Sequence, residues 1–511
     1  MWSSAYSAGV RTSTISSNWP RASRPQRCEP GGCGVGFMAG IVNPRADGCR
    51  RTPPTRLHWN ALERAAAMAW VPRGGPPVRF VPVKFSGETS IRPITRIKAA
   101  RLLPSFMAAL LMAAACQIGP ARAASPGASG ASPASRPAHA QALRDFGDPR
   151  AGRLAERFWA VEAGRSERPF AIVQFGDSHT ASDAFTAGLR VGLQQRLGDA
   201  GVGWLPPMAV PGQGHQRVNL ESQGWRLTSS LDQASDAFPL GGDIASPAQA
   251  GAVTRVASWA PDQSPYLATV LVRPGGRSGL FVENPDGRRL PLDGGEPVGG
   301  WSYVQVPVRL PFQIVAPAAG AAEVGGIWLR RADTSGALVS PIGVNGSRQD
   351  IWTRWSPGWL DQLRRSGSDL VIIAYGTNEA FNGQLDPQAL AAGLAQGIRQ
   401  VRQALPEAAV LLLGAPGALD PGKPAALPCG ERGVPMHETV KRVQLDVARQ
   451  EKTLYWDWEA AMDGDCPMLD WQARGWVGPD LIHFTQEGYR ESSRRFYRAL
   501  MNFFERSRGR R

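Results

Sequence analysis

Apolar and polar residues recur along the chain with two different periods. Short apolar runs, typical of buried strands, are each followed by a longer stretch whose apolar residues recur at helical spacing. The apolar runs lie at 170–175, 369–375, 409–413 and 453–456, and the helical stretches at 183–197, 387–405, 436–450 and 486–504. Strands that alternate with helices in this way form a parallel sheet with helices on both faces. The pattern therefore predicts an α/β domain.

The stretch between the first and second apolar runs has a different pattern. Residues 303–310 alternate between apolar and polar, 268–273 and 280–283 have the composition of short strands, and Pro-Asp-Gly at 285–287 favours a turn. Helical spacing is absent there. The sequence thus predicts a β-rich module inserted into the α/β domain. The predicted bounds are 206–335 for the module and 143–205 together with 336–511 for the α/β domain.

The first 142 residues lack the pattern of a folded domain. Residues 1–90 are rich in Arg, Pro, Gly and Ser without a sustained period, which is typical of a disordered extension or of a misassigned start codon. Residues 91–123 combine a basic stretch, an apolar stretch and Ala-Arg-Ala at 121–123, and this order predicts a signal peptide. The tract at 124–142, rich in Ala, Ser and Pro, is predicted to be a flexible linker.

An export signal determines where the protein is expected to act. We expect a periplasmic or secreted protein, with a lipid anchor on Cys116 as the alternative. No segment after the predicted cleavage site reaches the roughly 18 to 20 apolar residues of a membrane-spanning helix. The sequence therefore predicts no integral membrane segment after cleavage.

The formal net charge of +14 raises the question of nucleic-acid binding. Of the 57 Lys and Arg residues, 17 lie in residues 1–123, together with only 4 of the 43 acidic residues. The rest of the chain carries a net charge of +1, whereas phosphate binding needs a clustered basic surface. Nucleic acid is therefore not an expected partner.

Two of the six cysteines, Cys429 and Cys466, lie in the predicted α/β domain. In an oxidising compartment such a pair favours a disulfide, which would close a loop of about 40 residues and contribute roughly 3 to 4 kcal/mol to stability. His437 is the nearest histidine, and one histidine with two distant cysteines is weak support for zinc. We predict no metal and no cofactor.

Two motifs at opposite ends of the α/β domain carry candidate chemistry. Gly-Asp-Ser at 176–178 follows an apolar run and precedes a helical stretch, which places Ser178 at the carboxyl edge of the predicted sheet. Asp480 and His483 lie just before the last helical stretch, and their spacing lets the carboxylate orient the imidazole toward a serine. Taken alone, Gly-Asp-Ser is more often an ordinary helix cap, and Asp-x-x-His is more often part of an ordinary loop.

Two further motifs follow apolar runs. Asn378, in Tyr-Gly-Thr-Asn-Glu at 375–379, is predicted to offer its side-chain amide to an oxyanion. Gly346, in Gly-Val-Asn-Gly-Ser at 343–347, offers a backbone N–H that no Cβ obstructs. Four such motifs at strand ends of one domain favour a hydrolytic site over four unrelated turns.

With these four motifs the chain resembles the SGNH (GDSL-type) hydrolase superfamily, whose blocks supply Ser, Gly, Asn and His. His179 occupies the position of the leucine in the GDSL pattern. The resemblance implies a flavodoxin-like, three-layer α/β domain in which Ser178 is the nucleophile, His483 the base and Asp480 the residue that orients the base. It also implies an oxyanion hole formed by Ser178, Gly346 and Asn378.

Gly-Asp-Ser-His-Thr, Gly-Thr-Asn-Glu-Ala and the inserted β module are together similar to bacterial peptidoglycan O-acetylesterases. In these enzymes the insert resembles a family-35 carbohydrate-binding module, a β-sandwich or jelly roll. The resemblance covers residues 145–505 and implies a serine esterase that removes O-acetyl groups from a glycan, with peptidoglycan of the cell wall as the expected substrate.

Other functions remain open at this point. One alternative is an esterase of the same chemistry on another acetylated polysaccharide, or on small esters or lipids. The other is a glycan-binding protein without activity. Such a protein would be expected to lack at least one residue of the set Ser178, Gly346, Asn378, Asp480 and His483. The sequence leaves the oligomeric state open.

Several residues near the motifs are expected to have structural roles. His179 is expected to pack or to line the pocket rather than to act as the base. Trp352, Trp355 and Trp359 are expected to form a core stripe rather than a platform for sugars. Asp457 is expected to cap a helix.

Overall fold

The computed structural model describes residues 142–235, 237–274, 276–320, 322–332 and 335–509. The predicted signal peptide, the extension before it and all but the last residue of the predicted linker lie outside the described residues. Within these ranges, no helix combines the length and the apolar composition that crossing a bilayer requires.

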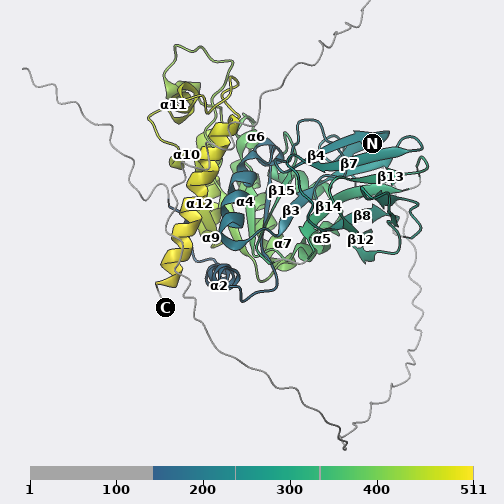
Figure 1. The fold of residues 1–511 in the computed structure, drawn as a ribbon. Helices are drawn as coiled ribbons and strands as arrows, with labels where there is room; N and C mark the ends of the chain where they lie inside the picture. Colours follow the sequence, from purple (N-terminus) through teal and green to yellow (C-terminus); the bar gives the residue numbers. More distant parts are fainter. Residues whose placement is uncertain (1–141, 236, 275, 321, 333–334, 510–511) are drawn as a thin grey trace, which may run out of the picture. The chain divides into compact units, whose positions relative to one another are not determined.

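A six-stranded sheet forms the centre of the α/β domain (Figure 1). Its strand order is β1-β18-β17-β16-β2-β15. Only β1 runs antiparallel to its neighbour, β18, whereas the other pairs are parallel. Taken in chain order from β2, the parallel strands have the order 2-1-3-4-5 of flavodoxin-like folds, so the predicted fold is confirmed. The strands are β1 (Arg144–Asp145), β2 (Phe170–Gly176), β15 (Ala337–Gly343), β16 (Leu370–Ala374), β17 (Ala409–Leu413) and β18 (Leu454–Trp456).

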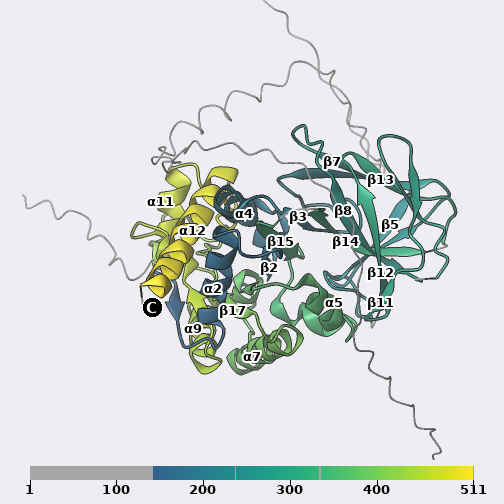
Figure 2. The ribbon, with the colours of Figure 1, turned by 60° about the horizontal axis from the view of Figure 1, so that its bottom comes forward.

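Helices cover both faces of this sheet (Figure 2). Phe170 and Ile172 of β2 face the core that α2, α4 and α12 close, whereas Val173 and Phe175 face the core that α5, α7 and α9 close. The helices are α2 (Ala151–Glu162), α3 (Ser178–Ala181), α4 (Ala184–Leu197), the 3-10 helix η3 (Gln349–Arg354), α5 (Trp359–Ser366), α6 (Thr377–Ala380), α7 (Pro387–Ala404), α8 (Cys429–Arg432), α9 (His437–Gln450), α10 (Trp458–Ala461), α11 (Pro467–Ala473) and α12 (Gln486–Arg508).

Local sequence explains why these elements form where they do. The central strands, such as Leu-Val-Ile-Ile-Ala in β16, are buried on both faces and carry no charge, as expected of a parallel sheet covered by helices. Helix α7 begins at Pro387, directly after Asp386, whose carboxylate accepts a hydrogen bond from the backbone N–H of Gln388. Asp457 caps α10 in the same way through the N–H of Ala460, so its predicted capping role is confirmed.

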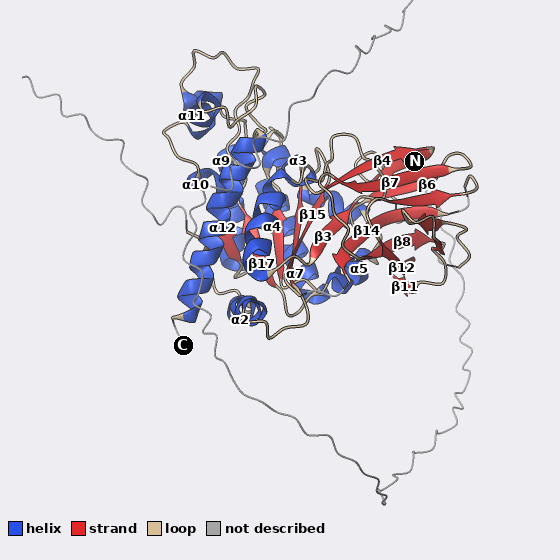
Figure 3. Ribbon diagram, viewed as in Figure 1, coloured by secondary structure: helices blue, strands red, loops and turns tan. Residues whose placement is uncertain are grey.

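In the part of the inserted module that the structure describes, the regular elements are strands and there is no helix (Figure 3). Two antiparallel sheets, ordered β10-β9-β13-β7-β4 and β11-β12-β8-β14-β6-β5, enclose an apolar core of their own. The strands are β3 (Gly201–Leu205), β4 (Val218–Gln223), β5 (Trp225–Ser229), β6 (Asp243–Pro247), β7 (Ala252–Ser258), β8 (Tyr266–Arg273), β9 (Phe281–Glu283), β10 (Arg289–Pro291), β11 (Glu296–Val298), β12 (Trp301–Val308), β13 (Phe312–Ala316) and β14 (Glu323–Arg331). Because β3 pairs with β14, this sheet takes in a strand that precedes residue 206, the predicted start of the module.

The module shares a hydrophobic core with the α/β domain. Trp204 and Trp301 belong to the same buried cluster as Trp352, Trp355 and Trp359. These last three side chains are only 2 to 4 % exposed, which confirms the predicted core stripe. The module is therefore packed directly against the domain that it interrupts in sequence.

Candidate active site

The nucleophile candidate, Ser178, lies at the carboxyl end of β2. Asp177 caps the short helix α3, because its carboxylate accepts a hydrogen bond from the backbone N–H of His179 at 3.0 Å. Gly176 is required by close packing, since a Cβ there would lie 2.2 Å from Oγ1 of Thr180 and 2.6 Å from the carbonyl oxygen of Ala374. The strand, the tight turn and the cap therefore hold Ser178 at the point where β2 and β16 meet, the usual ligand site of this sheet order.

Ser178, His483 and Asp480 form one hydrogen-bonded chain. Oγ of Ser178 lies 2.8 Å from Nε2 of His483, and Nδ1 of His483 lies 2.7 Å from Oδ2 of Asp480. The serine and the histidine are 305 positions apart in the sequence, so only the fold brings them together. This is the geometry in which an imidazole can take the proton of a hydroxyl while a carboxylate fixes its tautomer.

The backbone around Asp480 holds its carboxylate in place. Oδ1 of Asp480 accepts hydrogen bonds from the backbone N–H groups of Ile482 and His483, at 3.1 and 3.0 Å. Leu481, between them, has a φ of 57°, a left-handed conformation that costs a residue with a Cβ about 1 to 2 kcal/mol. Burial alone would raise the pKa of Asp480, but the hydrogen bonds from the His483 ring and from these N–H groups lower it overall. The carboxylate is therefore ionised at neutral pH.

The predicted oxyanion donors share a cavity with the serine. Ser178, Gly346, Asn378 and His483 all line a cavity of about 720 Å³. Gly346 has a φ of 73°, a conformation that favours glycine. Nδ2 of Asn378 donates one hydrogen bond to the carbonyl oxygen of Ser347 at 2.9 Å, which fixes the amide beside the cavity and leaves its second N–H for a substrate.

Two buried carboxylates support this edge of the sheet. Glu379 accepts hydrogen bonds from the backbone N–H groups of Gln349 and Gly376, at 2.8 and 3.0 Å, and so ties the Asn378 motif to the segment that follows Gly346. Burial, together with the nearby charge of Glu379, raises the pKa of Asp177 to about 7. Both acids belong to the motifs, but sequence reasoning gave neither of them a role.

His179 packs behind His483, as predicted. It is 2 % exposed, its ring centroid lies 5.3 Å from that of His483, and Nδ1 lies 2.9 Å from the hydroxyl of Tyr489. Burial lowers the pKa of His179 to about 3, so the ring is neutral. Tyr489, which also lines the cavity, was missed by sequence reasoning because nothing distinguishes it from a core residue of the last helix.

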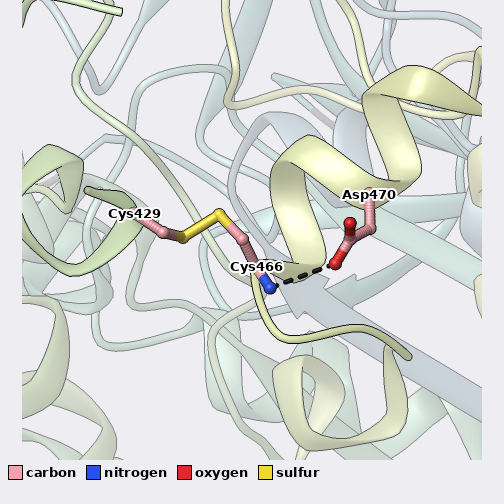
Figure 4. The surroundings of a disulfide bond; sticks show 3 residues. All are labelled: Cys429, Cys466 and Asp470. Carbon is pink, nitrogen blue, oxygen red and sulfur yellow. Dashed lines mark hydrogen bonds between the residues drawn. A yellow bond between two sulfur atoms is a disulfide. The ribbon is translucent and has the colours of Figure 1, made fainter. Parts of the chain in front are cut away.

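A disulfide joins the two loops that precede the histidine motif. Cys429, at the start of α8, is bonded to Cys466, the residue before α11, as predicted (Figure 4). The N–H of Cys466 also donates a hydrogen bond to the carboxylate of Asp470 at 3.0 Å. The backbone N–H of Leu419, in the same loop as Cys429, donates to the carbonyl oxygen of Leu481 at 3.0 Å. The cross-linked loops therefore contact the turn that carries Asp480 and His483.

One group among the described residues has the ligand types of a metal site. Ligand atoms of His437, Glu438 and Glu459 all lie within 4.8 Å of one another. The ammonium of Lys441 contacts the carboxylate of Glu459, however, and its positive charge occupies the place that a cation would need. None of these residues lines the catalytic cavity.

Comparison with known families agrees with this geometry. Residues 200–313 match the model of the N-terminal domain of peptidoglycan O-acetylesterases, and residues 319–491 match that of the GDSL-like lipase/acylhydrolase family. No curated protein matches the chain.

Among solved structures, a peptidoglycan O-acetylesterase is 33 % identical to this chain, with a TM-score of 0.64. The alignment covers 71 % of this chain and 99 % of the other. An aryl esterase of M. smegmatis is 20 % identical, with 33 % of this chain and 79 % of that one covered and a TM-score of 0.24. A carbohydrate acetylesterase of Sinorhizobium meliloti is 17 % identical, with 32 % and 79 % covered and a TM-score of 0.24. The last two scores are too low to add to the argument.

The fold and these comparisons define the class of protein as a carboxylic-ester hydrolase. The chain belongs to the SGNH (GDSL-type) hydrolase superfamily, and within it is similar to peptidoglycan O-acetylesterases.

Proposed function

We propose that this protein is an exported serine esterase that removes O-acetyl groups from peptidoglycan. The observation that carries the proposal is the continuous chain of contacts from the Ser178 hydroxyl through His483 to the Asp480 carboxylate. The similarity to a peptidoglycan O-acetylesterase over nearly the whole length of that protein supports the choice of substrate.

The proposed mechanism is acyl transfer in two steps. His483 takes the proton of Ser178 as the hydroxyl oxygen attacks the ester carbonyl, and Asp480 stabilises the imidazolium that forms. N–H groups of Ser178, Gly346 and Asn378 stabilise the negative oxygen, and the alcohol of the glycan leaves with the proton from His483. Water, activated by the same histidine, then releases acetate from Ser178.

Location follows from the substrate as well as from the sequence. Peptidoglycan lies outside the cytoplasmic membrane, and residues 91–123 have the composition of a signal peptide. We therefore place the protein in the periplasm or outside the cell.

The direct test is acetate release by the purified protein from O-acetylated peptidoglycan, acetylated xylan and a long-chain ester. We expect a preference for peptidoglycan, and Ser178→Ala should lower turnover by about 10⁴- to 10⁶-fold. A fluorophosphonate probe should label the wild-type protein but not this variant. Preference for the long-chain ester would overturn the substrate, and wild-type turnover in Ser178→Ala would overturn the mechanism.

A further inference from the structure

Some of the exposed apolar side chains lie at or beside the cleft. Among the described residues four large apolar side chains are exposed, and one of them, Phe381, lines the catalytic cavity. A second, Leu231 of the module, lies beside Gly346, with Cδ2 3.9 Å from the position that a Cβ there would take. The third and most exposed is Trp259 at 64 %, between β7 and β8 of the module, and the fourth, Val191, lies in the middle of α4.

The connection between β3 and β4 links the cleft to this tryptophan. Gly212 lines the cavity, and the carbonyl oxygen of Pro211 accepts a hydrogen bond from the side chain of Asn345 at 3.3 Å. The backbone N–H of Gly214 donates to the carbonyl oxygen of Ala181 at 3.0 Å. This connection is therefore attached to the α/β domain at two points and, through Gly212, forms part of the cavity wall.

Trp259 is fixed at the far end of that wall. Its indole Nε1 donates a hydrogen bond to the carbonyl oxygen of His215 at 2.9 Å. His215 is itself buried, and its Nε2 lies 3.5 Å from Oδ2 of Asp183. The Oδ1 atom of Asp183 accepts a hydrogen bond from Arg190. The polar atom of the indole is thus satisfied by the protein, and an anchored side chain that is 64 % exposed offers its ring to a ligand.

The tryptophan lies within reach of a substrate bound in the cleft. Gly212, in the cavity wall, and His215, which holds the indole, are three positions apart in the sequence, and that length of chain spans at most about 10 Å. A polysaccharide that places one acetyl group at Ser178 extends beyond the cavity. The same chain can therefore pass over Trp259.

We infer that Trp259 is a stacking platform for a sugar ring of the glycan whose acetyl group is bound at Ser178; this inference rests on the proposed function. An indole face pairs with the apolar C–H face of a sugar while the sugar hydroxyls stay in water, and the occupied Nε1 leaves the face as the means of recognition. The module thus contributes a second contact to the substrate and makes long glycans better substrates than short esters.

The test compares two substrates for each variant: soluble O-acetylated peptidoglycan fragments of several disaccharides and 4-nitrophenyl acetate. Trp259→Ala should lower the ratio of kcat/KM on the fragments to kcat/KM on the small ester by about three- to tenfold, through KM alone. Trp259→Gln keeps an amide donor for the His215 carbonyl but lacks the ring, and it should lower the ratio as much. Val191→Ala, an exposed apolar residue outside the cleft wall, should leave the ratio unchanged.

The ratio cancels any loss of folded protein, because both activities fall together in that case. A wild-type ratio in Trp259→Gln would overturn the inference whether or not Trp259→Ala folds. A wild-type protein that hydrolyses the small ester but releases no acetate from any fragment would instead overturn the proposed function.

Discussion

The sheet edge of the α/β domain that carries Ser178 and the inserted module present different surfaces to the same cleft. At the edge, hydrogen bonds to the backbone hold the Asn378 amide and the Asp480–His483 turn, and the His483 ring contacts the side chains of both Ser178 and Asp480. The module contributes Gly212, with no side chain, and apolar groups such as Leu231 and Trp259 beside the cleft.

This contrast indicates a division of labour. Proton transfer and oxyanion stabilisation need polar atoms placed to a few tenths of an ångström, which the ends of parallel strands provide. Contact with a sugar face tolerates looser placement, so loops of an antiparallel module suffice. Substitutions at the edge should therefore change kcat on every ester, whereas substitutions in the module should change KM on long glycans only.

Loss of the carboxylate at the edge should have the largest effect short of removing the nucleophile or the base. In Asp480→Asn the amide no longer holds the required tautomer of His483, and kcat should fall by about 10⁴-fold on both the glycan and 4-nitrophenyl acetate. Steady-state kinetics on the two substrates measures this. Asp470→Asn, in the cap of α11, is the matched control and should retain activity. If Asp480→Asn lowers kcat on the glycan but not on 4-nitrophenyl acetate, the proposed difference between the roles of the edge and the module is wrong.

Removal of the amide donor tests the oxyanion site. Asn378→Ala should lower kcat by about 100- to 1,000-fold on both substrates, with little change in KM, because the donor acts only on the developing charge. The control at the same surface is Asn382→Ala, because the side-chain oxygen of Asn382 accepts a hydrogen bond from the backbone N–H of Gln384. If KM rises while kcat stays constant, Asn378 binds substrate and is not an oxyanion donor.

Removal of the disulfide tests how much this bond stabilises the loops beside the edge. Replacing both Cys429 and Cys466 by Ser should lower the free energy of unfolding by about 3 to 4 kcal/mol, because the unfolded chain regains the freedom of the closed loop. Urea unfolding of the oxidised protein and of the double variant measures the difference. Equal midpoints would show that the bond adds nothing to the stability of these loops.

His179 is buried behind the residues of the edge that line the cavity, so its role is expected to be structural. Its folded pKa of about 3 lies below the ordinary 6.5, so its contribution to stability is present above pH 6.5 and is lost as the pH falls toward 3. The difference in unfolding free energy between wild type and His179→Asn should therefore be about 2 kcal/mol smaller at pH 5 than at pH 7. Other acids titrate in both proteins and cancel. If the difference in unfolding free energy between the two proteins does not change with pH, His179 is not the group whose pKa is lowered on folding.

The sequence alone was sufficient for the α/β domain and for the set of candidate residues. Uncharged runs such as 370–374 have no stable position except a buried strand, and each motif follows such a run, so the parallel sheet brings the motifs to one edge. The pairing of Cys429 with Cys466 was the only one open to the cysteines of that domain.

Only the tertiary structure decided how these residues meet and what surrounds them. The 2.8 Å contact of Ser178 with His483 closes a gap of 305 positions, which no local pattern specifies. The contact of Tyr489 with His179 depends on packing between segments far apart in the sequence. The same is true of the connection that runs from Gly212, at the cleft, to the residue that holds the indole of Trp259. Local periodicity fixes which face of an element is buried, whereas long-range packing fixes which side chains become neighbours.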